Sequence, residues 1–148
     1  MTKEIWFDMD GTIADLYGVD GWLDDLIAEN TRPYAVAIPL VNFSLLARLL
    51  NQLQAQGWKL GIVSWTSKNG SELYNLAIET VKRTWLTQHL PSVEWDEIKV
   101  VRYGTNKRMI CGGGILFDDE EGNRKAWGAG AYHPSEMMEL LKALRQKG

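Results

Sequence analysis

The stretch that decides the fold is Ile5-Trp6-Phe7-Asp8-Met9-Asp10-Gly11-Thr12, close to the N-terminus. Its three leading apolar residues are typical of a short buried strand. Two carboxylates and a glycine follow directly, so Asp8 and Asp10 stand where that strand ends. Gly11 allows the backbone to turn sharply behind them. The stretch therefore predicts a buried strand that carries acidic side chains at its carboxyl end.

Downstream of this strand, apolar runs alternate with helical stripes. We expect further strands over 58–63, 98–101, 115–117 and 129–132, and helices over 42–56, 71–86, 121–127 and 136–146. In the helix over 71–86 the side chains expected to face inward are Leu73, Leu76, Ala77, Thr80, Val81 and Thr84. Ser135 is the expected cap of the last helix. Strands separated by helices predict an α/β fold, a Rossmann-like three-layer sandwich around a central parallel sheet.

Length and charge narrow the class of protein. The 148 residues suit a single domain over 1–148. The formal net charge of −3 argues against general electrostatic binding to DNA or to an anionic membrane. No stretch approaches the ~18 apolar residues that span a bilayer. Cys111 is the single cysteine, which excludes an intramolecular disulfide and favours a reducing, cytoplasmic setting.

Polar side chains follow the predicted strands at their carboxyl ends. They are Asp8, Asp10, Ser64, Tyr103, Asp118 and Asp119. In a parallel sheet these ends lie along one edge, where ligands bind. Several carboxylates cannot gather in a low dielectric unless a cation sits among them or some are protonated. Oxygen ligands of this kind suit Mg²⁺, so the pattern predicts a magnesium site at this edge.

These motifs together resemble the haloacid dehalogenase-like (HAD) phosphohydrolase superfamily. Asp8 to Thr12 is similar to its first motif, and Leu60 to Ser64 to its second. Lys107 is similar to the third motif, and Ile115 to Asp119 to the fourth. The four occur in the family's order and span almost the whole chain. The resemblance implies a HAD core with a minimal cap and Mg²⁺-dependent hydrolysis of a phosphomonoester.

The resemblance also implies a role for each matching residue. Asp8 would be the nucleophile that forms an aspartyl-phosphate, and Asp10 would be the general acid and base. Gly11 and Ser64 would contact the phosphate, and Lys107 would neutralise charge on it. The metal would be held by Asp8, the backbone carbonyl of Asp10 and Asp118, while Asp119 would hold a metal-bound water or orient Lys107.

Two of these assignments have a rival nearby in the chain. Thr66 competes with Ser64 as the phosphate ligand of the second motif. Arg108 competes with Lys107 as the residue that neutralises charge. Both alternatives stay open at the level of sequence.

The segments around the predicted site indicate which kind of substrate it accepts. Residues 13–41, interrupted by glycines and prolines, supply a short flap or small lid, and the chain between 64 and 107 has no room for a large cap. Trp65 either stacks on a nucleobase or sugar or packs under the flap. Likewise, Tyr17, Trp22 and Tyr34 either line the entrance or form the flap's own core. An open site with an aromatic edge favours a nucleotide or a nucleic-acid end phosphate.

Two other functional classes are compatible with parts of the pattern. The first is a non-catalytic, phosphate- or nucleotide-binding regulatory module of the same fold, which the Asp8/Asp10 pair argues against. The second is a receiver domain, in which the phosphorylated aspartate ends a later strand. The position of the motif at the first strand disfavours it.

Overall fold

Five parallel strands form one sheet, in the order β3-β2-β1-β4-β5, in the computed structural model, which describes residues 2–147. The strands are β1 (Glu4–Phe7), β2 (Lys59–Trp65), β3 (Glu97–Val101), β4 (Ile115–Phe117) and β5 (Ala131–Tyr132). The expected α/β fold with a central parallel sheet is confirmed. β1 has β2 on one side and β4 on the other, so the strand order reverses there. In open parallel sheets a crevice in which ligands bind commonly forms at such a reversal, which here lies at the carboxyl end of β1.

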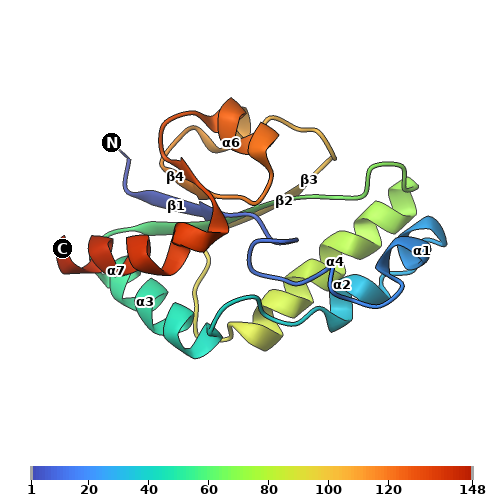
Figure 1. Cartoon of the computed structure of the whole chain (residues 1–148), viewed down its shortest axis with the longest axis horizontal. Coiled ribbons are helices and arrows are strands. Elements are labelled where there is room, and N and C mark those ends of the chain that lie inside the picture. The colour runs from blue at the N-terminus through green and yellow to red at the C-terminus, as the bar shows by residue number, and fades with distance from the viewer. Residues whose placement is uncertain (1, 148) are drawn as a thin grey trace.

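Helices cover both faces of the sheet (Figure 1). They are α1 (Trp22–Ile27), α2 (Arg32–Val36), α3 (Phe43–Ala55), α4 (Glu72–His89), α5 (Lys107–Cys111), α6 (Glu121–Trp127) and α7 (Met137–Lys147), with a 3₁₀ turn, η1 (Pro134–Glu136), before the last. In Figure 1 the paired helices α3 and α7 lie below the strands and α6 lies above them. No helix among residues 2–147 is both long and apolar enough to cross a membrane.

The alternation of side chains along each strand explains the three layers. Ile5 and Phe7 point into a large core that they share with α3, α4 and α7. Trp6 points the other way, into a smaller core with Trp127 of α6. Successive strand residues face opposite sides of a sheet, so each short strand supplies both cores.

Side-chain caps determine where the long helices begin. The Asn42 side chain accepts a hydrogen bond from Leu45 N at the start of α3, and Ser71 accepts one from Tyr74 N at the start of α4. Both helices therefore begin where expected. The expected cap at Ser135 is wrong: His133 caps η1 by accepting from Ser135 N, and α7 continues from that turn.

The inward face of α4 differs from the face expected from its sequence. Its buried side chains are Tyr74, Ile78, Lys82, Trp85 and Leu86. Leu73 and Leu76 are instead 79% and 63% exposed, and Ala77, Thr80 and Thr84 are exposed as well. Apolar character predicts the wrong stripe here, because a lysine, Lys82, lies in the middle of the buried helical face.

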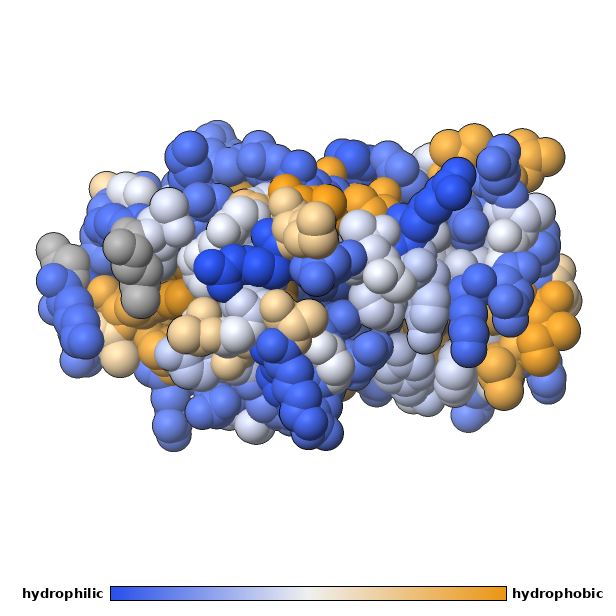
Figure 2. Space-filling model, turned by 90° about the horizontal axis from the view of Figure 1, so that it is seen from above, coloured by the Kyte–Doolittle hydropathy of each residue, from blue (hydrophilic) through white to orange (hydrophobic). Residues whose placement is uncertain are grey.

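Residues 13–41 include two short helices, and we refer to this segment as the lid. It contains α1 and α2, and Pro33 fits in the first turn of α2, where a proline needs no hydrogen-bonded N–H. A third apolar cluster of Leu16, Tyr34, Tyr74 and Ile78 packs the lid against α4. α1 itself has no buried residue. Figure 2 shows apolar side chains gathered at the end of the molecule where Figure 1 places α1 and the start of α4.

Candidate active site

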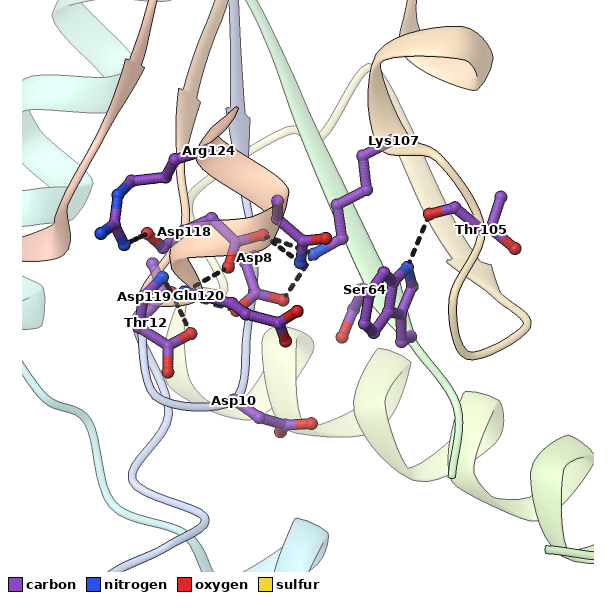
Figure 3. Close-up of polar contacts among 12 residues, drawn as sticks. Asp8, Asp10, Thr12, Ser64, Thr105, Lys107, Asp118, Asp119, Glu120 and Arg124 are labelled. Carbon is purple, nitrogen blue, oxygen red and sulfur yellow. Dashed lines mark hydrogen bonds and ion pairs between the residues drawn. The ribbon is translucent and has the colours of Figure 1, made fainter. Parts of the chain in front are cut away.

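Three carboxylates from two neighbouring strand ends meet beside β1 (Figure 3). Asp8 directly follows β1, and Asp118 and Asp119 directly follow β4. Each offers one carboxylate oxygen, and these oxygens lie within 4.8 Å of one another. Asp8 is 7% exposed and Asp118 is fully buried. The register of β1 with β4, which pairs Phe7 with Phe117, brings the two ends together.

Lys107 is the cation that pairs with this cluster. It begins α5, is 3% exposed, and its Nζ donates to Asp8 Oδ1 at 2.9 Å and to Asp118 Oδ2 at 2.7 Å. Burial lowers the pKa of Lys107, but the charges of Asp8 and Asp118 outweigh burial and raise it, which keeps the ammonium charged. The rival Arg108 points away, since its guanidinium donates to the backbone carbonyls of Gly112 and Trp127.

The turn after β1 is built to fit the cluster closely. Gly11 has φ +80°, which disfavours other residues, and a Cβ there would collide with the Asp119 carboxylate. The hydroxyl of Thr12 donates to Asp8 Oδ2 at 3.1 Å and accepts from the backbone N–H of Asp119 at 3.2 Å. Thr12 therefore ties the ends of β1 and β4 to one another.

The charges of the cluster fit a divalent cation. Burial, together with the charge of Asp8, raises the pKa of both Asp118 and Asp119. This shift means that Lys107 alone does not compensate the three carboxylates. Three oxygen donors in a mostly buried pocket are the donor set that Mg²⁺ takes in proteins. Asp8, Asp118 and Asp119 are thus suited to hold it.

Asp10 lies apart from the other carboxylates (Figure 3) and has a partner that sequence reasoning missed. Its Oδ2 accepts from Lys82 Nζ at 2.9 Å, and its side chain is 18% exposed. Burial raises the pKa of Asp10, and the charge of Lys82 acts in the opposite direction. Lys82 is 1% exposed on α4. The available signal was the position of Lys82, four residues after Ile78 and eight after Tyr74. This spacing places a charged residue on an apolar helical face.

The end of β2 supplies two hydroxyls and an indole. Ser64 is 1% exposed and its Oγ accepts from Lys82 Nζ at 2.7 Å. The buried Oγ1 of Thr66 finds no hydrogen-bond partner among residues 2–147. The Nε1 of Trp65 donates to the backbone carbonyl of Thr105 at 3.0 Å, and its ring contacts that of Tyr103.

A cavity of about 580 Å³ lies between this site and the lid. Asp8, Asp10, Lys107, Asp118 and Asp119 line its inner part, and Thr66 and Trp65 line it from the end of β2. Tyr17 and Trp22 contribute from the lid, with ring centres 5.0 Å apart. Tyr34 also reaches the cavity but is 6% exposed and packs in the lid's own core. A ligand in this cavity would touch the carboxylates and the aromatic side chains together.

Comparison with solved structures supports the fold. No protein-family model matches the sequence, and no curated protein matches it either. A D,D-heptose 1,7-bisphosphate phosphatase from B. bronchiseptica, crystallised with magnesium and phosphate, has a similar fold: the TM-score is 0.60 at 14% identity, over 99% of this chain and 100% of that one. The enzyme of the same description from Burkholderia thailandensis gives a TM-score of 0.53 at 16% identity, over 87% of this chain and 74% of that one. The likeness confirms the expected fold.

Proposed function

We propose that this protein is a HAD-type, Mg²⁺-dependent phosphomonoester hydrolase that works through an aspartyl-phosphate on Asp8. The observation that carries the proposal is the cluster of Asp8, Asp118 and Asp119 around Lys107 at the floor of the cavity. A fold neighbour that is a phosphatase with magnesium and phosphate bound supports it. When bound, Mg²⁺ would supply positive charge to the phosphoryl oxygens.

The proposed reaction has two steps that use the same two carboxyl groups. In the first, an oxygen of Asp8 attacks phosphorus, the bond from phosphorus to the ester oxygen breaks, and Asp10 gives its proton to that oxygen. In the second, the Asp10 carboxylate takes a proton from water while the water oxygen attacks the phosphorus of the aspartyl-phosphate. The bond between phosphorus and the Asp8 oxygen breaks, so free phosphate leaves and the Asp8 carboxylate is regenerated. The raised pKa of Asp10 favours the protonated form that the first step needs.

Three side chains are suited to hold the transferring phosphate. Lys107 would neutralise its charge beside Asp8. Thr66 lines the cavity, and its buried Oγ1 has no hydrogen-bond partner within residues 2–147, whereas the hydroxyl oxygen of Ser64 already accepts from Lys82. We therefore assign Thr66 as the residue whose hydroxyl binds the phosphate from the cavity. Ser64 is assigned as a second phosphate ligand on the buried side of the site.

For the substrate we propose a nucleotide or a nucleic-acid end phosphate. The support is Trp65, which stands next to Ser64 and presents part of its indole to the cavity. Its hydrogen bond to Thr105 holds the ring in place before any ligand arrives. An aromatic surface that is already fixed stacks on a base with little loss of side-chain entropy.

The deciding experiment measures phosphate release with Mg²⁺ over a panel of phosphomonoesters, alongside the Asp8→Asn variant. We expect turnover that chelation of Mg²⁺ abolishes, and none from Asp8→Asn, which keeps the shape but loses the attacking charge. Beryllofluoride should form an adduct at Asp8 that fluorine NMR detects. Phosphate binding without release by the native protein would point to a regulatory module instead.

A further inference from the structure

Apart from the carboxylates and Lys107, the side chains that line the cavity are mostly aromatic or apolar. The ring centres of Trp65 and Tyr103 lie 4.8 Å apart at 55° and form one wall, which we call the aromatic wall. The Lys107 ammonium lies 5.3 Å from the centre of the indole, so this wall directly adjoins the phosphate position.

The lid contributes apolar surface that nothing in the described chain covers. α1 presents Trp22, Leu23, Leu26 and Ile27 to the cavity. Leu23 is 53% and Ile27 is 73% exposed, and no α1 side chain is buried. Exposed apolar side chains that border a cavity gain free energy when a ligand removes them from water. The lid thus favours a leaving group with apolar faces.

The charged side chains that line the cavity favour a ligand with a single phosphate. Among its lining residues the cations are Lys107, which Asp8 and Asp118 already engage, and the exposed Lys68. Two carboxylates, Glu29 and Glu120, also line the outer part. A second phosphate would lie beside these acids with a single exposed lysine to compensate it. The lining therefore disfavours bisphosphates.

A nucleic-acid strand is disfavoured for the same reason. Strands are bound through rows of lysine and arginine that follow the backbone, combined with stacking side chains. Here the formal net charge is −3, and the side chain of Arg102, the residue before Tyr103, is 89% exposed and lies 3.9 Å from Glu72. Among the described residues that line the cavity, the stacking surface is accompanied by two cations, Lys68 and Lys107, rather than by a row of them.

We propose that the aromatic wall and the lid form a leaving-group subsite for a small ester with one phosphate and one planar aromatic group. Nucleoside monophosphates and aryl phosphates share this chemistry. The inference rests on the proposed phosphatase function and narrows it, because it selects the mononucleotide over the nucleic-acid end. With a volume of about 580 Å³, the cavity lies within the roughly 300–1,000 Å³ of small-molecule sites.

The test compares kcat/KM across matched substrates with Mg²⁺ present. The aromatic arm uses a nucleoside 5′-monophosphate and phenyl phosphate, which separate the two sources of aromatic leaving group. The other arm uses glycerol phosphate, fructose 1,6-bisphosphate and a 5′-phosphorylated oligonucleotide. We expect kcat/KM to be at least about tenfold higher for the aromatic monophosphates, the size of one stacking contact.

Two variants probe the subsite directly. Trp65→Leu and Tyr103→Leu should each lower the ratio of aromatic to glycerol-phosphate kcat/KM by roughly tenfold, chiefly through KM. Leu76→Ala is the matched control, since Leu76 is 63% exposed on α4 outside the cavity, and its ratio should equal that of the native protein. The proposed subsite is wrong if all three variants have the same ratio of aromatic to glycerol-phosphate kcat/KM. It is also wrong if the native protein prefers the bisphosphate or the oligonucleotide.

A binding measurement separates this inference from the proposed function. Equilibrium dialysis of the nucleoside monophosphate and of glycerol phosphate against the Asp8→Asn protein requires no turnover. Tighter binding of the nucleotide, reduced by adding Trp65→Leu, supports the subsite even if no phosphate is ever released. Turnover of glycerol phosphate with equal affinity for both ligands would instead leave a phosphatase without this specificity.

Discussion

Lys82 Nζ lies 2.9 Å from Asp10 Oδ2, although 72 residues separate the two in the chain. The same ammonium donates to Ser64 Oγ at 2.7 Å and to the backbone carbonyl of Trp65 at 2.8 Å. A lysine has three donors, so each donor of this buried side chain has an acceptor. One residue of α4 thereby connects the turn after β1 to the end of β2.

Lys82→Met tests this connection, because methionine keeps most of the length of the side chain and removes the charge. The Asp10 carboxylate, 18% exposed, would lose its ion pair, and we expect the free energy of unfolding to fall by roughly 1–3 kcal/mol. The value of kcat should fall more than KM rises, since Asp10 would no longer be held in place. Urea unfolding and steady-state kinetics measure both effects. Lys142→Met, an exposed lysine on α7, is the control, and indistinguishable results for the two variants would contradict the prediction.

The sheet and its acidic edge could be predicted because both depend on local patterns. Short apolar runs that end in carboxylates identify β1 and β4, and parallel pairing then places Asp8 beside Asp118 and Asp119. The side chains at the ends of β2 and β3 follow from the same rule. A pattern of this kind needs no knowledge of which helix packs where.

Apolar periodicity alone does not identify Lys82 as a site residue, because its environment is created by tertiary packing. Apolar periodicity assigns a lysine to the solvent side of a helix, and only the approach of Asp10 and Ser64 makes its burial favourable. Apolar periodicity also does not predict the helices α2, which contains Pro33, and α5, whose five residues are too few for a periodic signal. Likewise, the choice between Lys107 and Arg108 depends on which way α5 faces.

Thr66→Val addresses the unpaired hydroxyl at the end of β2. Valine has nearly the same shape, so the variant removes a buried oxygen that has no partner within residues 2–147. We expect thermal stability to be equal or higher, because a buried polar group without a hydrogen bond is unfavourable. We also expect KM for phosphomonoesters to rise roughly tenfold, the value of one hydrogen bond to a charged group. A large loss of stability with unchanged KM would mean that Thr66 is structural.

Mg²⁺ binding should depend on pH through Asp118 and Asp119. Without metal, burial and the charge of Asp8 raise the pKa of Asp119 to about 7 and that of Asp118 to about 6, from 3.8. The folded state then binds more protons than the unfolded state between about pH 4 and pH 7, so metal-free stability falls as pH rises through this window. Mg²⁺ competes with those protons, and its affinity should rise over the same range.

Thermal unfolding with and without Mg²⁺ measures this linkage. The increase in Tm caused by Mg²⁺ should be small near pH 5 and large near pH 8, because a ligand stabilises the folded state only when it binds. Asp118→Asn is the matched variant, since it removes one of the titrating ligands. Its Mg²⁺-induced shift should be small at both pH values, and an equal shift for the native protein at both would refute the linkage.

Asp10→Asn distinguishes the proposed acid–base role of Asp10 from the nucleophilic role of Asp8. Asparagine keeps the shape of Asp10 but neither gives nor takes a proton, so water would lack a base in the second step. With p-nitrophenyl phosphate the leaving group needs little protonation, and the first step should survive better than the second. We expect a burst of nitrophenolate followed by slow turnover, with phosphoenzyme accumulating on Asp8. General acid–base help is worth ~10²–10⁴-fold, so the two phases should be well resolved by stopped-flow absorbance.

An alkyl phosphate provides the contrast for the same variant. Its leaving oxygen needs the proton of Asp10, so both steps should slow, and no burst of the released alcohol should precede steady turnover. Asp10→Ala serves as a second variant, because it also removes the acceptor of the Lys82 hydrogen bond. If Asp10 acts only by proton transfer, the two variants should share the leaving-group dependence and differ only in stability. Equal loss on both substrates, with no phosphoenzyme trapped in either variant, would assign Asp10 a purely structural role.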